Sequence, residues 1–196
     1  MIAGIDWITE HADTIEVANM SLGSVGSSDP QDPMRIAIQN ATAKGVVFVV
    51  AAGNDGKDAA SYAPAAFPEV ITVSAIADSD GLSQAKGTAT EYGADDTFAT
   101  FSNFGSVVDI AAPGVDILST WIGGQYNTIS GTSMATPHVT GVVALRIAAG
   151  GRAKSAAEVE AIKNDLISGG YAQSSQNGFS DDPDSSKEPL ANASKW

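Results

Sequence analysis

Residues 46–52 read VVFVVAA, a continuous apolar run. A run this short is typical of a β-strand covered on both faces, as in parallel sheets flanked by helices. Residues 53–56, GNDG, follow directly and predict a turn. Because ligands in parallel α/β sheets bind beyond the carboxyl ends of the strands, this turn is also a candidate position for functional side chains.

Short apolar strands alternate with helices through the rest of the chain, which predicts an α/β fold with a parallel sheet. One helix has Asp32 as a capping residue, Pro33 at its first position and Gly45 at its end. We expect further strands at 15–22, 70–76 and 107–111, and helices at 4–11, 33–44, 132–149 and 155–168. The chain length predicts one domain spanning 1–196, of which 171–196 is an irregular extension.

Composition excludes several classes of function. With 10 basic and 23 acidic residues, the formal charge of −13 argues against nucleic-acid binding, which needs clustered Lys and Arg. The absence of cysteine excludes disulfides and thiolate chemistry. No apolar run approaches the roughly 20 residues of a membrane span, so no membrane partner is expected. Residues 1–11 contain Asp6 and Glu10 and no Lys or Arg, so no signal peptide is expected there.

Residues 132–149 are apolar nearly all round, which predicts a buried helix. Residues 131–138, GTSMATPH, place Ser133 in its first turn after a glycine. Unpaired backbone N–H groups at a helix N-terminus can stabilise an oxyanion, so Ser133 is a candidate nucleophile. The alternative is that Thr132 or Ser133 caps the helix.

Two further segments are weak indications of function when each is taken alone. The side-chain amide of Asn54, after the strand at 46–52, could donate to an oxyanion, although GNDG is also an ordinary turn sequence. Residues 19–23, NMSLG, end another expected strand and carry no signal by themselves.

Taken together, the segments GTSMATPH (131–138), AAGN (51–54), NMSLG (19–23) and SNFGSVVDIAAPG (102–114) resemble the catalytic domain of subtilisin-like serine proteases, specifically its C-terminal part. The resemblance covers about residues 2–193 and implies a three-layer α/β fold: a partial parallel sheet flanked by helices, truncated on its N-terminal side. It implies Ser133 as nucleophile and Asn54 as oxyanion donor. The implied substrate-binding residues are Ser21, Leu22, Gly23, Ala51, Ala52, Gly53 and Thr132.

The resemblance also bears on cofactors and localisation. It implies no required cofactor, a weak cation site, calcium for example, on the backbone carbonyls of Ala65, Phe67 and Val70, and an extracellular protein. Residues 78–81, DSDG, have the composition of a calcium loop but lack the later glutamate of an EF-hand, so a polar turn is the simpler interpretation.

The motifs that carry the aspartate and histidine of the family's catalytic triad are not found in residues 1–196. His138 lies five residues after Ser133, about 140° away around a helix, and is a poor base for it. His11 ends the first expected helix, where a structural role is expected. We therefore predict impaired proteolysis, or proteolysis that depends on a complementing N-terminal segment.

Three hypotheses follow. The first is a subtilisin-type serine hydrolase acting on a peptide or ester. The second is a stand-alone esterase whose base differs from the family's. The third is a non-catalytic peptide-binding or assembly module. Because the strand at 15–22 would lack a neighbour, its open edge predicts self-association or pairing with the complementing segment.

Overall fold

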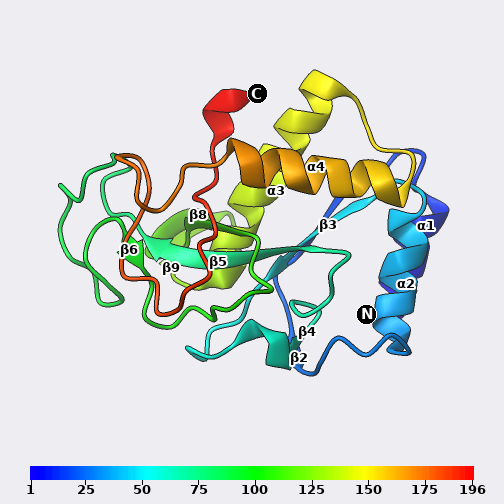
Figure 1. Ribbon diagram of the computed structural model, residues 1–196, viewed down its shortest axis with the longest axis horizontal. Helices are drawn as coiled ribbons and strands as arrows, with labels where there is room; N and C mark the ends of the chain where they lie inside the picture. Colours follow the sequence, from blue (N-terminus) through cyan, green and yellow to red (C-terminus); the bar gives the residue numbers. More distant parts are fainter.

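A five-stranded mixed sheet forms the centre of the molecule, seen in a computed structural model that describes residues 1–196 (Figure 1). Its parallel strands, in spatial order, are β1 (Val17–Met20), β3 (Val47–Ala51), β5 (Ile71–Ala77) and β7 (Ile110–Pro113). The fifth strand, β6 (Thr97–Phe98), pairs antiparallel with the end of β5. The predicted parallel sheet is confirmed, and the antiparallel β6 was not foreseen.

Alternate residues of β3 face opposite layers of helices. Val47 and Val49 pack in one apolar cluster with α3 (Thr132–Gly150) and α4 (Ala156–Gly169). Phe48 and Val50 pack in a second cluster with residues of α1 (Ile2–Glu10) and α2 (Pro33–Thr42). This is the predicted three-layer α/β arrangement, in which β3 is buried on both faces.

Local signals place the helix starts well. The Asp32 carboxylate accepts from the N–H of Met34 at 2.7 Å, and Ser155 Oγ accepts from the N–H of Glu158 at 3.3 Å. Helix α2 ends at Thr42, earlier than Gly45, whose φ of +92° and contact with the Ala153 carbonyl leave no room for a Cβ atom.

Two sequence expectations need correction. Strand β7 begins at Ile110 and not at 107, because Val108 belongs to a turn and Asp109 uses its carboxylate to accept from the N–H of Thr72. Helix α3 is not buried all round. Its inner face lies on the sheet, but nothing in this chain packs on the opposite face, where Leu145 is 47% exposed. That outer face consists of Pro137, His138, Gly141, Ala144, Leu145 and Ala148.

The two edges of the sheet differ. Along β7, residues 189–191 add backbone hydrogen bonds to Ala111, so the C-terminal segment covers this edge. Strand β1 pairs with β3 and ends the sheet on the other side. The expected open edge is therefore present.

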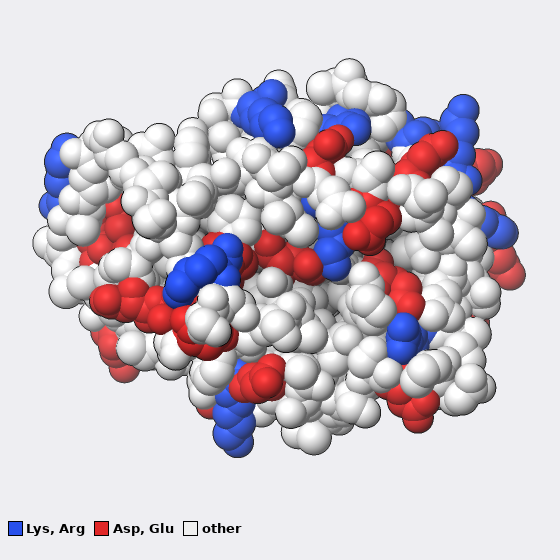
Figure 2. Space-filling view, in the orientation of Figure 1, with Lys and Arg blue, Asp and Glu red and all other residues white.

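Short elements complete the fold. Strand β2 (Ser24–Val25) pairs with β4 (Tyr62–Ala63), and β8 (Ile117–Trp121) pairs with β9 (Gln125–Ile129). The 3₁₀ turns are η1 (Ala59–Ser61) and η2 (Ala193–Lys195). None of the helices combines the length and apolarity needed to cross a membrane. On the face shown in Figure 2, basic side chains lie beside acidic ones and do not gather into a patch.

Candidate active site

A cavity of about 480 Å³ opens at the carboxyl ends of β1 and β3, beside the N-terminus of α3. It brings together eight of the nine residues predicted for catalysis or substrate binding: Leu22, Gly23, Ala51, Ala52, Gly53, Asn54, Thr132 and Ser133. Sequence reasoning missed the rest of its lining, which consists of Ser24, Val25, Asp55, Tyr62, Ala63 and Ala65. Most of these belong to the β2–β4 pair, whose two-residue strands give no local signal.

Ser133 is the second residue of α3 and is half-buried. Its N–H lies in the first turn, where no intrahelical acceptor exists. Its Oγ donates to the carbonyl oxygen of Ser21 at 3.3 Å, and Ser21 Oγ donates to the Ser133 carbonyl at 2.8 Å. Ser21, the ninth predicted residue, thus contacts the candidate nucleophile although it does not line the cavity.

The side-chain amide of Asn54 has a fixed orientation. Its Oδ1 accepts from both the backbone N–H and the Oγ–H of Thr132, each at 2.8 Å. Because a backbone N–H can only donate, the oxygen must face Thr132, and Nδ2 lies on the other side of the amide plane without a hydrogen-bond partner in the protein. Asn54 Nδ2 and the N–H of Ser133 are therefore two free donors at one cavity.

The loop that carries Asn54 is held by a residue to which the sequence assigned no role. Asn103 is fully buried, its Nδ2 donates to the Ala52 carbonyl at 2.9 Å, and its Oδ1 accepts from the N–H groups of Asp55 and Lys57 at 3.0 Å each. Gly53, at φ +109°, makes room for this amide. Asn103 positions the loop, and its own segment contains no signal for a partner so distant in sequence.

Neither histidine bonds to Ser133. His11 Nδ1 lies 2.8 Å from the Trp7 carbonyl oxygen, and its ring stacks on the indole with centroids 4.0 Å apart. His138 Nδ1 lies 2.9 Å from the Met134 carbonyl oxygen. Each ring is thus held by its own helix, as expected of structural histidines.

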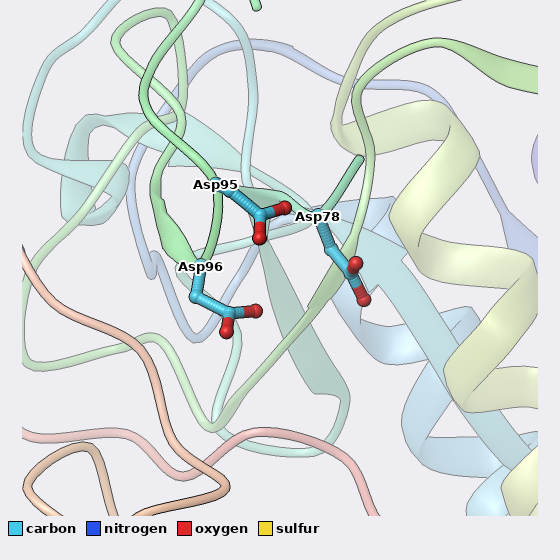
Figure 3. Close-up of side chains that lie close together, drawn as sticks. All are labelled: Asp78, Asp95 and Asp96. Atoms are coloured by element: carbon cyan, nitrogen blue, oxygen red, sulfur yellow. The ribbon is translucent and has the colours of Figure 1, made fainter. Parts of the chain in front are cut away.

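Three carboxylates, from Asp78, Asp95 and Asp96, lie within 4.8 Å of one another (Figure 3). They accept from backbone N–H groups of the surrounding loop, Asp78 from Gly81 and Asp95 from Ser79 among them. Burial raises the pKa of Asp78, and its two neighbouring carboxylates raise it further. These bonds organise the polar loop of residues 78–87, and the three carboxylates are a candidate group for a metal ion.

Comparison with known proteins decides the family. Residues 1–179 match the Subtilase family of peptidase S8. The chain belongs to the subtilase family. Similar curated proteins include subtilisin-like protease 2 of Pseudogymnoascus destructans, 42% identical over 86% of this chain, and an extracellular serine proteinase of Thermus sp., 46% identical over 74%. The solved structure of a cold-adapted subtilisin-like serine proteinase matches 96% of this chain with a TM-score of 0.72 and 37% identity.

This subtilase chain spans only part of its relatives. It covers 38% of the length of the Pseudogymnoascus protease, 31% of the Thermus proteinase and 59% of the cold-adapted proteinase. The comparisons show the family and the fold of this chain.

The three backbone carbonyl groups that the resemblance implies for a cation site each accept a hydrogen bond in the protein. The carbonyl oxygen of Ala65 accepts from Thr72 Oγ1 at 2.8 Å, and that of Phe67 accepts from the Val70 N–H. The carbonyl oxygen of Val70 accepts from the ammonium group of Lys163. Each of these three oxygens therefore has a different hydrogen-bond partner.

Proposed function

We propose that this chain carries the nucleophile, the oxyanion hole and the acyl-side binding cleft of a serine hydrolase. The observation that supports this most strongly is the convergence at one cavity of Ser133 Oγ with two free donors, the Ser133 N–H and Asn54 Nδ2. Acyl transfer requires this combination of groups, because negative charge develops on the carbonyl oxygen as the nucleophile attacks.

In the proposed reaction, Ser133 Oγ attacks the acyl carbon and releases its proton to solvent water. The two donors stabilise the tetrahedral oxyanion, which collapses as the leaving group departs as an anion. A water molecule then attacks the acyl carbon, gives up a proton to solvent and displaces Ser133 Oγ, which regains a proton from solvent as the carboxylic acid leaves. An extended substrate lies along Ser21, Leu22 and Gly23, and its side chain enters the cavity beside the small residues of β3. These steps use no cofactor.

No side chain near Ser133 acts as a base in the hydrogen bonds of this chain. Ser133 Oγ donates to a backbone carbonyl, which cannot take up its proton at neutral pH. A positioned nucleophile and an oxyanion hole alone retain roughly 10³-fold catalysis over water. We therefore propose that residues 1–196 act mainly on activated esters, and that peptide hydrolysis depends on a base from a complementing segment.

Labelling with a serine-directed fluorophosphonate tests the assignment of the nucleophile. The chain should be labelled, and Ser133→Ala should abolish labelling because it removes the hydroxyl group of the proposed nucleophile. Ser130→Ala, three residues away, is the matched control and should label like the unchanged chain. Full labelling of Ser133→Ala would show that another residue is the nucleophile. Peptide binding without labelling of the unchanged chain would favour the alternative of a non-catalytic binding module.

A second proposal concerns partners. Strand β1 has an open edge, the outer face of α3 is exposed, and the chain covers only 59% of the length of the cold-adapted proteinase. We propose that these surfaces bind the complementing N-terminal segment of a subtilase or, when that is absent, a second copy through β1. The name of the Thermus relative supports an extracellular location.

Sedimentation tests the pairing through β1. The isolated 19.9 kDa chain should form larger species as its concentration rises. Glu16 O accepts from the N–H of Val47, so the N–H of Val17 points to the open edge. Val17→Pro should therefore reduce association, and Val17→Ala, which removes side-chain atoms but keeps the N–H, should not. Equal association of both variants would exclude this edge as the contact.

A further inference from the structure

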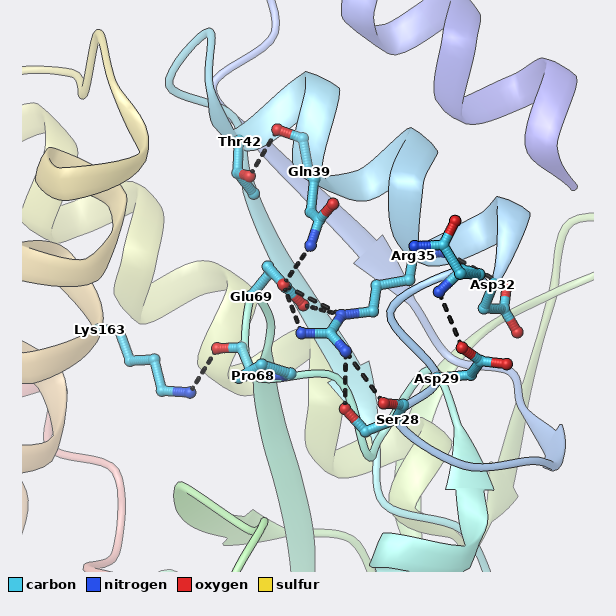
Figure 4. A network of polar contacts seen from close by, with 10 residues as sticks. Ser28, Asp29, Asp32, Arg35, Gln39, Thr42, Pro68, Glu69 and Lys163 are labelled. Atoms are coloured by element: carbon cyan, nitrogen blue, oxygen red, sulfur yellow. Dashed lines mark hydrogen bonds and ion pairs between the residues drawn. The ribbon is translucent and has the colours of Figure 1, made fainter.

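The ammonium group of Lys163 on α4 lies in a cradle of three oxygen atoms. Its Nζ is 2.8 Å from the Val70 carbonyl oxygen, 2.9 Å from Asp109 Oδ2 and 3.4 Å from the Pro68 carbonyl oxygen. The contact to Pro68 is drawn in Figure 4. The side chains of Lys163 and Asp109 are only 13% and 14% exposed. An ammonium group has three hydrogens, so this cradle provides one acceptor for each.

The donor set has the chemistry of a hard-cation site. Two backbone carbonyls and one carboxylate are the oxygen ligands that Ca²⁺ takes in proteins. The single negative charge of Asp109 is balanced by the single positive charge of Lys163, and Asp109 Oδ2 also accepts from the Thr72 N–H at 2.9 Å. Burial raises the pKa of Asp109 and the nearby Lys163 opposes that rise, so the carboxylate relies on a neighbouring cation for its charged form.

Glu69, which lies between Pro68 and Val70, is held by side chains of α2. The Glu69 carboxylate accepts from Arg35 Nε and Nη2 at 2.9–3.1 Å and from Gln39 Nε2 at 2.7 Å (Figure 4). Residues 68–70 are thus tied to α2 through a side chain and to α4 through two backbone carbonyls. They lead directly into β5, so the position of the Lys163 cation affects the central sheet.

We propose that Lys163 is a built-in cation at a calcium-type oxygen site: its ammonium group fills the position that a metal ion would take. The chain thereby fixes residues 68–70 without a metal at this place. The cradle excludes Ca²⁺ while the lysine is present, and removing the ammonium group opens a site for Ca²⁺ on the Pro68 and Val70 carbonyls and the Asp109 carboxylate. This inference does not depend on the proposed hydrolase activity.

Two substitutions of Lys163 separate the loss of the cation from the opening of space. Lys163→Ala removes the ammonium group and leaves room, whereas Lys163→Met removes it and fills the room with an uncharged chain of similar length. Titration calorimetry with Ca²⁺ should show one more binding site in Lys163→Ala than in the unchanged chain or in Lys163→Met. For a millimolar site, about 10 mM Ca²⁺ should raise the Tm of Lys163→Ala by roughly 3–6 °C more than that of the other two.

Addition of Asp109→Asn to Lys163→Ala should remove the extra site and the extra Tm shift. Any Ca²⁺ bound elsewhere, for example near Asp78, is common to all variants and cancels in the comparison. The proposal is overturned if Lys163→Ala responds to Ca²⁺ no more than Lys163→Met. It is also overturned if the unchanged chain responds as strongly as Lys163→Ala and loses that response with Asp109→Asn.

Discussion

Asn54→Asp should lower kcat/KM for an activated ester by about 10²- to 10³-fold, the loss expected when one oxyanion donor is removed. An aspartate keeps the acceptor oxygen that holds the N–H and hydroxyl of Thr132 but replaces the Nδ2 donor with a second, negatively charged oxygen. The developing oxyanion would then lose a hydrogen bond and face a like charge. Steady-state kinetics with a nitrophenyl ester measure the effect.

The unfolding temperature distinguishes this role from a structural one. Asn54→Asp should unfold close to the unchanged chain because both bonds to Thr132 persist. Asn54→Leu, of similar volume, should lose the same catalytic factor and also be less stable, since the Thr132 N–H loses its partner. An Asn54→Asp variant with full activity would show that Asn54 is not an oxyanion donor.

The second large effect concerns pH and stability. Glu188 is buried, with 5% of its surface exposed, and its Oε1 accepts from Ser74 Oγ on β5 at 2.8 Å. Burial raises its pKa to about 7 from the ordinary 4.5, and the neighbouring Asp182 and Asp184 add to the rise. Between these two values the folded chain holds a proton that the unfolded chain has released.

The contribution of Glu188 to the free energy of unfolding should therefore be highest at pH 4.5 and below, and it should fall as the pH rises towards 7. The total loss is about 3 kcal/mol, at roughly 1.4 kcal/mol for each unit by which the pKa is raised. Glu188→Gln should unfold like the unchanged chain at pH 4.5 and be more stable at pH 8, as measured by urea unfolding across this range. Glu91→Gln, on an exposed side chain, controls for the removal of one negative charge. If Glu188→Gln and the unchanged chain showed the same dependence of stability on pH, Glu188 would not be the group responsible for the loss.

Much of the fold follows from local sequence. The apolar run at 46–52 and the capping residues Asp32 and Ser155 act over a few residues, and the structure has the strand and both helix starts where they were predicted. The errors arise where distant contacts override a local pattern. The expected strand start at Val107 is replaced by a turn because Asp109 binds Thr72, and the apolar helix α3 is exposed on one face because this chain supplies nothing to cover it.

The candidate site divides in the same way. Ser133, Asn54 and the NMSLG segment were proposed as site residues because four short segments, taken together, resemble subtilisin-like proteases. The second wall of the cavity, from β2 and β4, depends on a pairing between separate loops, and no residue in either strand signals the other.

The sequence by itself determined the class of fold and its main strands and helices, and it indicated Ser133 and Asn54 as candidate nucleophile and oxyanion donor, since these rest on short sequence patterns. Only the tertiary structure decided which distant residues hold these elements and loops in place. Asn103 reaches the Ala52 carbonyl across 51 residues, Lys163 reaches Val70 across 93, and Ser74 reaches Glu188 across 114. Hydrogen bonds and charges act over a few ångströms in space, and chain separation carries no information about them until packing of the sheet and helices brings the groups together.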